Sequence, residues 1–274
     1  MQFIIPPQLT EEQRMLLTIY LSDDYRLKRS EWPQIFKAVD WLGQAKVVTH
    51  NKFRTFRQLY LEYIDTSLAD LYLEQLLALS DVQKESPPLI AAFARQVQVL
   101  LRRAGLLGSS ESWLLLAYCL YWWQSFARGY TFEVEIIRDL QDSGLIFEAH
   151  DLSRRWERYS PADLEVLGLA GDIKTSTYFL KSKPRSPLRS DFYITRLYEK
   201  GRSRTLVVFQ KTLAWDKING STIDGTLANL QDILPYPVRI QQSNTTLVVV
   251  DYTLWKQRVL QVQQDEGADY EKHH

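Results

Sequence analysis

Three carboxylates and a lysine are grouped in a short, otherwise largely aliphatic segment, PADLEVLGLAGDIKTS, Pro161 to Ser176. The charged residues of this segment are Asp163, Glu165, Asp172 and Lys174. Burying unpaired charges costs free energy, so the group is either a solvated face or a site for a ligand of opposite charge. Carboxylates are oxygen ligands suited to Mg²⁺ or Mn²⁺, and a nearby lysine can neutralise a phosphate. The pattern therefore favours metal-assisted hydrolysis of a phosphodiester bond.

The segment is expected to fold as a tight antiparallel hairpin. Gly168 and Leu169 would form a two-residue loop, because glycine at the first loop position suits a type II′ turn. The facing pairs in that register are Leu167 with Ala170, Glu165 with Asp172, and Asp163 with Lys174. Side chains alternate along a strand, so all four charged residues project from one face. The residues expected on the opposite, apolar face are Leu164, Val166 and Ile173.

These residues resemble the motif of the PD-(D/E)xK nucleases, which have the restriction-endonuclease-like fold. The resemblance rests on Pro161 and Asp163, with one residue inserted between them, and on the triplet Asp172-Ile173-Lys174. Upstream, GYTFEVEIIRDLQDSG (Gly129 to Gly144) is similar to the first core helix of that superfamily. On this helix Glu133 shares a side with apolar residues and points partly toward the sheet. The resemblance covers roughly residues 129–215.

The resemblance implies a Mg²⁺- or Mn²⁺-dependent DNA endonuclease whose products carry a 5′-phosphate and a 3′-hydroxyl. Asp163 and Asp172 would be the main metal ligands, and Lys174 the catalytic lysine. Glu133 would be an accessory metal ligand, and Glu165 a substitute or second-metal ligand. DNA is the implied partner, and the chain could work as a homodimer or within a larger nucleic-acid-processing assembly.

Other interpretations of these residues remain open. The charged residues of the hairpin could form an exposed cross-strand ladder worth about 1 kcal/mol or less per pair, although three acids and one lysine pair poorly. The domain could also be a catalytically inactive nuclease-like scaffold that binds a protein or nucleic acid. His150-Asp151 is similar to the motif of HD phosphohydrolases. Those enzymes need further histidines on helices, and only His50 remains outside the C-terminal end.

Basic residues are concentrated around the hairpin although the formal net charge is zero. Between Asp151 and Lys217 there are fourteen basic and eight acidic residues, and such a surplus suits a polyanionic partner. The segment KSKPRSPLRS could contact nucleic-acid phosphates, or it could equally be a solvated loop. Its candidate phosphate-binding residues are Lys181, Lys183, Arg185 and Arg189.

The surrounding elements predict an α+β protein with a helical N-terminal region and a restriction-endonuclease-like α/β core with a central mixed sheet. The expected divisions are a helical domain at 1–124, a nuclease-like domain at 125–264 and a tail at 265–274. The helical domain would position substrate, dimerise or bind a partner. The single cysteine, Cys119, excludes an internal disulfide, and no apolar run is long enough to span a membrane. The N-terminal residues do not resemble a secretory signal, so a cytoplasmic location is expected.

Overall fold

The computed structural model describes residues 1–175, 177, 188–199, 202–210, 215, 216, 218, 221–242 and 245–272, without the side chains of 67, 159, 199, 202 and 267–272. The chain divides into two compact units, Met1–Thr131 and Phe132–His274. This division lies within the long helix α6 (Ser112–Asp142), which contributes residues to both units. The boundary expected between residues 124 and 125 falls inside the same helix.

The N-terminal unit is mainly helical, as the sequence predicts. Its helices before α6 are α1 (Glu11–Ser22), α2 (Trp32–Gln44), α3 (Phe56–Tyr60), α4 (Thr66–Ala78) and α5 (Val82–Arg103), with short turns η1 (Asp24–Arg26) and η2 (Leu61–Asp65). Thr10 and Gln13 form a reciprocal capping box at the start of α1. No helix among the described residues is both long enough and apolar enough to cross a membrane.

The N-terminal unit also contains a small sheet, which the prediction of a helical domain at 1–124 does not include. Strands β1 (Gln2–Ile5), β2 (Lys46–Thr49) and β3 (Lys52–Thr55) pair in the order β1-β2-β3. His50 and Asn51 both have positive φ and connect β2 to β3, and asparagine tolerates this conformation better than most residues. This short hairpin interrupts the helices between α2 and α3.

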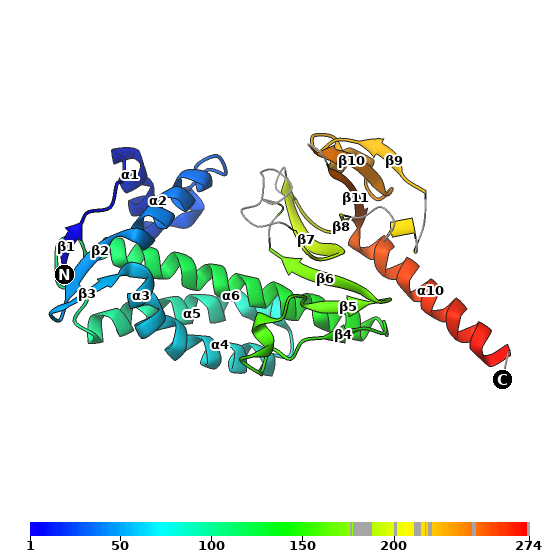
Figure 1. The fold of residues 1–274 in the computed structure, drawn as a ribbon, viewed down its shortest axis with the longest axis horizontal. Helices are drawn as coiled ribbons and strands as arrows, with labels where there is room; N and C mark the ends of the chain where they lie inside the picture. Colours follow the sequence, from blue (N-terminus) through cyan, green and yellow to red (C-terminus); the bar gives the residue numbers. More distant parts are fainter. Residues whose placement is uncertain are drawn as a thin grey trace. The chain divides into compact units, whose positions relative to one another are not determined.

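The C-terminal unit is built on an eight-stranded mixed sheet, which confirms the predicted α+β class (Figure 1). The strand order is β4-β5-β6-β7-β8-β11-β10-β9, with β6–β7 and β9–β10 parallel and the other neighbours antiparallel. The strands are β4 (Glu148–Ala149), β5 (Leu164–Val166), β6 (Leu169–Lys174), β7 (Phe192–Glu199), β8 (Arg202–Phe209), β9 (Ile223–Gly225), β10 (Val238–Gln242) and β11 (Thr245–Asp251). The other elements are η3 (Glu157–Tyr159), α9 (Leu230–Ile233) and α10 (Tyr252–Lys272), so the expected tail from residue 265 is helical through residue 272.

Both faces of this sheet are covered. Successive residues of its central strands are apolar, and their side chains point to opposite faces in turn. In β8, Val207 and Phe209 join the cluster that includes Trp255 of α10. Leu206 and Val208 point to the other face and pack in a cluster that includes Leu230 of α9. A strand with apolar residues on both faces is typical of a sheet that lies between two layers.

The end of α6 is fixed to the sheet by apolar and charged contacts. Phe132, Ile136 and Leu140 are buried in the same cluster as the strands. Glu135 forms a 2.5 Å ion pair with Arg196 of β7, and the Arg196 guanidinium lies 4.4 Å from the centroid of the Phe132 ring. These contacts determine where this turn of α6, and therefore Glu133, lies relative to the sheet.

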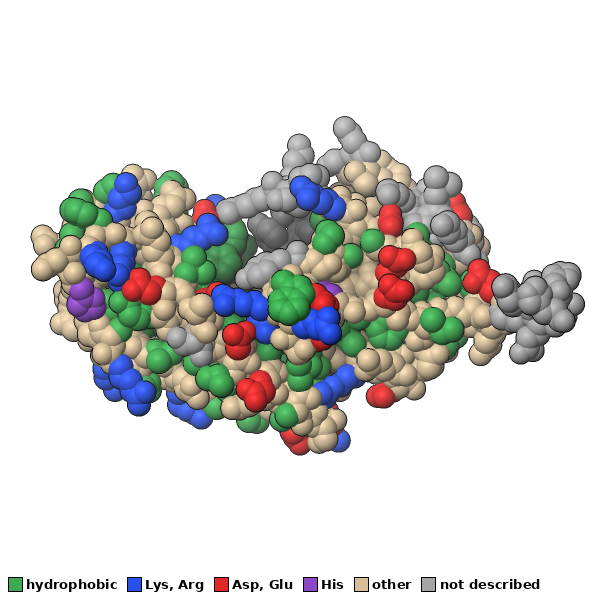
Figure 2. All heavy atoms as spheres, turned by 60° about the horizontal axis from the view of Figure 1, so that its bottom comes forward, with side chains coloured by type: hydrophobic (Ala, Val, Ile, Leu, Met, Phe, Trp, Pro, Cys, Tyr) green, Lys and Arg blue, Asp and Glu red, His purple; other side chains and the backbone are tan. Residues whose placement is uncertain are grey.

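Charged side chains of both signs are exposed and interspersed on the face drawn in Figure 2. This is in keeping with a chain that has 33 basic and 33 acidic residues. On this face there is no single broad region of one charge among the residues that the structure describes. A candidate site must therefore be identified from local groups of residues rather than from net charge.

Candidate metal centre

The hairpin β5–β6 forms, but its register differs from the predicted one. The paired residues are Leu164 with Gly171, Glu165 with Ala170, and Val166 with Leu169. The turn is therefore Leu167-Gly168 rather than Gly168-Leu169, and both of its residues have positive φ, 52° and 69°. Positive φ at both positions is typical of a type I′ turn rather than the predicted type II′. The observed register places Leu169 in the core, where it is 6% exposed, because it is a paired strand residue instead of a turn residue.

The two faces of the hairpin are divided as the alternation predicts. Leu164, Val166 and Ile173 are buried, whereas Glu165 and Lys174 are exposed and Asp172 is half-buried. The regular strand pairing begins at Leu164. One residue earlier, the backbone N–H of Asp163 donates a 2.9 Å hydrogen bond to the Gly171 carbonyl, outside the regular register. The new register brings Asp163 beside Asp172, rather than opposite Lys174 as predicted.

Asp163 makes contacts with both strand β6 and the segment that follows β4. Its Oδ2 accepts a 2.6 Å hydrogen bond from the backbone N–H of Ile173. Its Oδ1 lies 3.8 Å from Nδ1 of His150, which directly follows β4. The backbone N–H of His150 also donates a 3.1 Å hydrogen bond to the Asp163 carbonyl. Asp163 is therefore held in place by both its main chain and its side chain.

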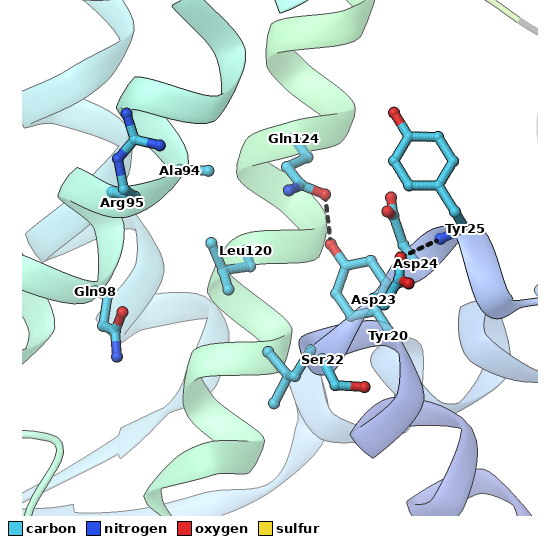
Figure 3. A pocket seen from close by; sticks show the side chains of 11 residues that line it. Tyr20, Ser22, Asp23, Asp24, Tyr25, Ala94, Arg95, Gln98, Leu120 and Gln124 are labelled. Carbon is cyan, nitrogen blue, oxygen red and sulfur yellow. Dashed lines mark hydrogen bonds between the residues drawn. The ribbon is translucent and has the colours of Figure 1, made fainter. Parts of the chain in front are cut away.

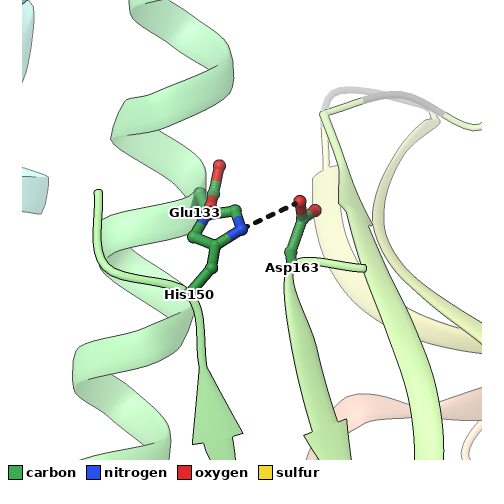
Figure 4. Close-up of side chains that lie close together, drawn as sticks. All are labelled: Glu133, His150 and Asp163. Carbon is green, nitrogen blue, oxygen red and sulfur yellow. Dashed lines mark hydrogen bonds and ion pairs between the residues drawn. The ribbon is translucent and has the colours of Figure 1, made fainter. Parts of the chain in front are cut away.

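His150 connects Asp163 to helix α6 (Figure 4). Its Nε2 is hydrogen-bonded to Oε1 of Glu133, and Glu133 itself is only 7% exposed. Its Nδ1 is buried and makes no well-formed hydrogen bond among the described residues, although Asp163 Oδ1 and the Ala162 backbone are nearby. Glu133, His150 and Asp163 each offer a ligand atom, and these atoms all lie within 4.8 Å of one another.

Asp172 and Lys174 are in direct contact, with Lys174 Nζ 2.5 Å from Asp172 Oδ1. Burial, together with the hydrogen-bonding carboxyl of Asp163 and its negative charge, raises the pKa of Asp172 to about 7 despite the opposing effect of Lys174. Burial lowers the pKa of Lys174, but its contact with Asp172 outweighs this and raises the pKa overall. When both aspartates are ionised they repel each other, and one lysine compensates only part of their charge.

The protonation of His150 depends on the same acidic groups. Burial lowers its pKa, but the hydrogen bond and charge of Glu133, with the charge of Asp163, raise the pKa above its usual value overall. A bound cation would compete with the proton on this ring, because a metal-binding imidazole must be neutral.

The other residues predicted for the site have different positions. Glu165 is exposed, opposite Ala170 in β6 and Glu148 in β4, and is not part of the Glu133–His150–Asp163 group. Arg189 is exposed just before β7, where its backbone N–H donates a 2.9 Å hydrogen bond to the Tyr193 hydroxyl. Three predicted phosphate-binding residues lie outside the described residues: Lys181, Lys183 and Arg185.

The sequence interpretation gave no role in this site to His150. The pair His150-Asp151 is a partial HD motif in the sequence, whereas in the structure His150 is hydrogen-bonded to Glu133 and lies 3.8 Å from Asp163. The available signal was its position in the chain, in the segment that connects the Glu133 helix to the hairpin. Position in that segment does not by itself require a contact with either element, because the contact depends on how the helix packs beside the hairpin.

An open cavity of about 370 Å³ lies in the N-terminal unit (Figure 3). It is lined by the end of α1, η1, α5 and α6, and Tyr20 donates a 2.8 Å hydrogen bond to Gln124 at its wall. Asp24 on its lining is already paired with Arg128 at 3.1 Å. None of the predicted site residues lines this cavity.

Comparison with known proteins does not assign the chain to a family. No family model matches it, and no curated protein or solved structure is significantly similar to it. The resemblance to PD-(D/E)xK nucleases therefore rests only on the motif residues and the helix segment Gly129 to Gly144. The function must be inferred from the chemistry of the site.

Proposed function

We propose that the protein is a metal-dependent nuclease with a PD-(D/E)xK-type site in a restriction-endonuclease-like core, and that it hydrolyses phosphodiester bonds in DNA. One observation carries this proposal: Asp163 and Asp172 are neighbours, and Lys174 contacts the Asp172 carboxylate at 2.5 Å. Two adjacent carboxylates beside a lysine suit a cation and a phosphate together. The same arrangement would be an inefficient structural ion pair, since it leaves negative charge uncompensated.

The donor atoms around Asp163 fit a divalent cation such as Mg²⁺ or Mn²⁺. The buried Nδ1 of His150 lacks a well-formed hydrogen bond and lies 3.8 Å from Asp163 Oδ1. Asp163, Asp172 and His150 would hold the cation, and Glu133 would orient the imidazole by accepting a hydrogen bond from its Nε2. This gives Glu133 an orienting role in place of the direct ligation that the resemblance implies. When bound, the cation would lower the pKa of a water and stabilise negative charge on the phosphate.

Lys174 would act on the phosphate or on the attacking water. Its side chain is 50% exposed, and its Nζ donates a hydrogen bond to Asp172. An ammonium group has three N–H donors, so donors remain for a phosphate or a water. A positioned ammonium group stabilises charge that develops on a phosphate oxygen. Asp172 would therefore have two functions, as a cation ligand and as the group that positions Lys174.

The experiment compares cleavage of supercoiled plasmid and of single-stranded DNA in Mg²⁺, Mn²⁺ and EDTA. Asp172→Asn and Lys174→Met should each reduce cleavage by roughly 100-fold or more, because each removes a group that acts on the reacting phosphate. Glu165→Gln is the matched control on the same face of the hairpin, and its activity should stay within about twofold of wild type because Glu165 is exposed and lies opposite Ala170 rather than opposite Asp172. Circular dichroism and thermal melting verify that each variant is folded.

Two results would contradict the proposal. Cleavage that persists in Asp172→Asn, or in EDTA, would exclude this centre as the catalytic site. DNA binding without cleavage in every metal would identify the alternative, a nuclease-like scaffold without catalysis.

A further inference from the structure

The chain between His150 and Asp163 forms a loop that begins and ends at the candidate metal centre. The backbone hydrogen bond from His150 N–H to the Asp163 carbonyl closes it at 3.1 Å. The loop has the sequence DLSRRWERYSPA and includes η3. Because both flanking residues belong to the centre, a ligand of the loop is tethered to the centre through both ends of the loop.

Most polar groups of this loop are used to hold its own conformation. Arg154 forms ion pairs with Asp151 and Glu157, both at 3.1 Å. The Glu157 carboxylate also accepts a 2.7 Å hydrogen bond from the backbone N–H of Asp151. Arg158 donates a 2.8 Å hydrogen bond to the carbonyl of Leu152, which is buried. Two of the three arginines are therefore structural.

Two adjacent side chains of the loop, Arg155 and Trp156, make none of these ion pairs or hydrogen bonds. Arg155 is exposed, and its guanidinium has no ion pair or hydrogen bond among the described residues. Trp156 is 73% exposed, the most exposed tryptophan of the described chain. A single exposed apolar residue is ordinary on a protein surface. Here, however, a large aromatic ring and an unpaired cation are neighbours on a loop that is otherwise held in place and leads to a carboxylate centre.

We infer that Arg155 and Trp156 form a binding surface for single-stranded nucleic acid. A base would stack on the Trp156 indole, and Arg155 would pair with an adjacent phosphate. The inference rests on the proposed nuclease function for its choice of partner, since a free arginine and an aromatic ring fit the two parts of a nucleotide. DNA and RNA share this chemistry.

A single strand fits this surface better than a duplex does. In a duplex each base face is covered by its neighbours, so a loop tryptophan has no base face to contact. An unpaired strand presents its bases, and stacking on an aromatic side chain does not depend strongly on base identity. The surface would thus supply affinity without sequence specificity and guide the strand toward Asp163 and Asp172.

Binding is measured without cleavage, by fluorescence anisotropy in EDTA with fluorescein-labelled oligo-dT, oligo-rU and a duplex of equal length. Trp156→Ala should weaken single-strand binding roughly 5- to 100-fold, and Trp156→Phe should retain most of the affinity. Arg155→Gln should weaken binding and reduce the dependence on salt by about one phosphate contact. Trp41→Ala and Arg239→Gln, two exposed residues on other elements, are the matched controls and should bind as wild type.

The relative affinities for oligo-dT and oligo-rU identify which nucleic acid the surface prefers. Wild-type affinity in Trp156→Ala would overturn the inference, as would tighter binding of the duplex or no binding of either single strand. The Asp172→Asn variant separates this inference from the proposed function. Trp156-dependent binding without cleavage by the wild type supports the surface alone, and cleavage that is lost in Asp172→Asn but insensitive to Trp156 supports the centre alone.

Discussion

Asp163 Oδ2 accepts a 2.6 Å hydrogen bond from the backbone N–H of Ile173, the residue between Asp172 and Lys174. This contact joins the Asp163 side chain directly to the strand that carries the other two motif residues. The second oxygen of the same carboxylate lies 3.8 Å from His150. Asp163 is therefore the residue at which the hairpin and the His150 loop meet, and the consequences of its charge can be measured.

Asp163→Asn should lower the pKa of Asp172. The amide oxygen can still accept the hydrogen bond from Ile173, but the negative charge that helps to raise the pKa of Asp172 to about 7 is removed. The measurement is a carbon-detected NMR titration of the Asp172 carboxyl group in EDTA. An unchanged midpoint would mean that the two carboxylates do not interact.

Folding stability without metal should fall as pH rises from about 4 to 7. In this window Asp172, with a pKa of about 7, stays protonated in the folded state, whereas its unfolded pKa is 3.8. The folded state then binds more protons, so raising the pH favours unfolding, by at most about 4 kcal/mol. His150 acts in the same direction above its unfolded pKa of 6.5, since its folded pKa is also raised.

Urea unfolding in EDTA at a series of pH values measures this effect. Asp172→Asn should lose most of the decrease between pH 4 and 7 and should exceed wild type in stability at pH 8. A stability difference between wild type and Asp172→Asn that does not change across this window would contradict the assigned ionisation of Asp172.

Mn²⁺ affinity should increase with pH between about 6 and 8, because Asp172 and His150 must lose protons to bind a cation. Each released proton contributes at most a tenfold change per pH unit. Isothermal titration calorimetry in two buffers of different ionisation enthalpy counts the protons that are released when Mn²⁺ binds. His150→Gln should release fewer protons and bind Mn²⁺ roughly tenfold or more weakly. Equal affinity in this variant would exclude His150 from the centre.

Gly168→Ala should destabilise the protein by about 1–2 kcal/mol, because the residue has φ of 69° in the turn. A Cβ at this position meets no atom within 4 Å, so the cost is conformational rather than steric. Gly129→Ala is a control for which the opposite sign is expected. An added Cβ at Gly129 also meets no atom within 4 Å, but this residue lies inside helix α6. That substitution should stabilise the protein by about 0.5–1 kcal/mol. Urea unfolding of both variants tests the sign of each effect.

Gly171→Ala should disturb both the core and the candidate metal centre. The added Cβ would lie 2.3 Å from Cζ of Phe192, a buried ring on the adjacent strand β7. Moving this ring costs about 1–3 kcal/mol and shifts the strand next to Asp172. Thermal melting and Mn²⁺ titration should both be affected, and Phe192→Leu in the same chain should partly restore them. Failure of this second substitution to restore either property would argue against the steric explanation.

The sequence alone determined the division of the hairpin into an apolar and a charged face, because side-chain alternation is a local property of a strand. It also predicted the α+β class through local patterns of the same kind. The turn position was not determined, since Leu167-Gly168 and Gly168-Leu169 both offer glycine to a two-residue loop. Burial of Leu169 distinguishes them, and burial depends on the rest of the core.

Only the tertiary structure decided which residues join the motif. His150 reaches Glu133 on α6 and Asp163 at the hairpin because α6 packs against the sheet through Phe132, Ile136 and Leu140. No repeat or spacing in the chain encodes that contact, since it depends on how a helix, a connecting loop and a hairpin pack together. Local periodicity could identify the carboxylates, whereas the position of the imidazole depends on long-range packing.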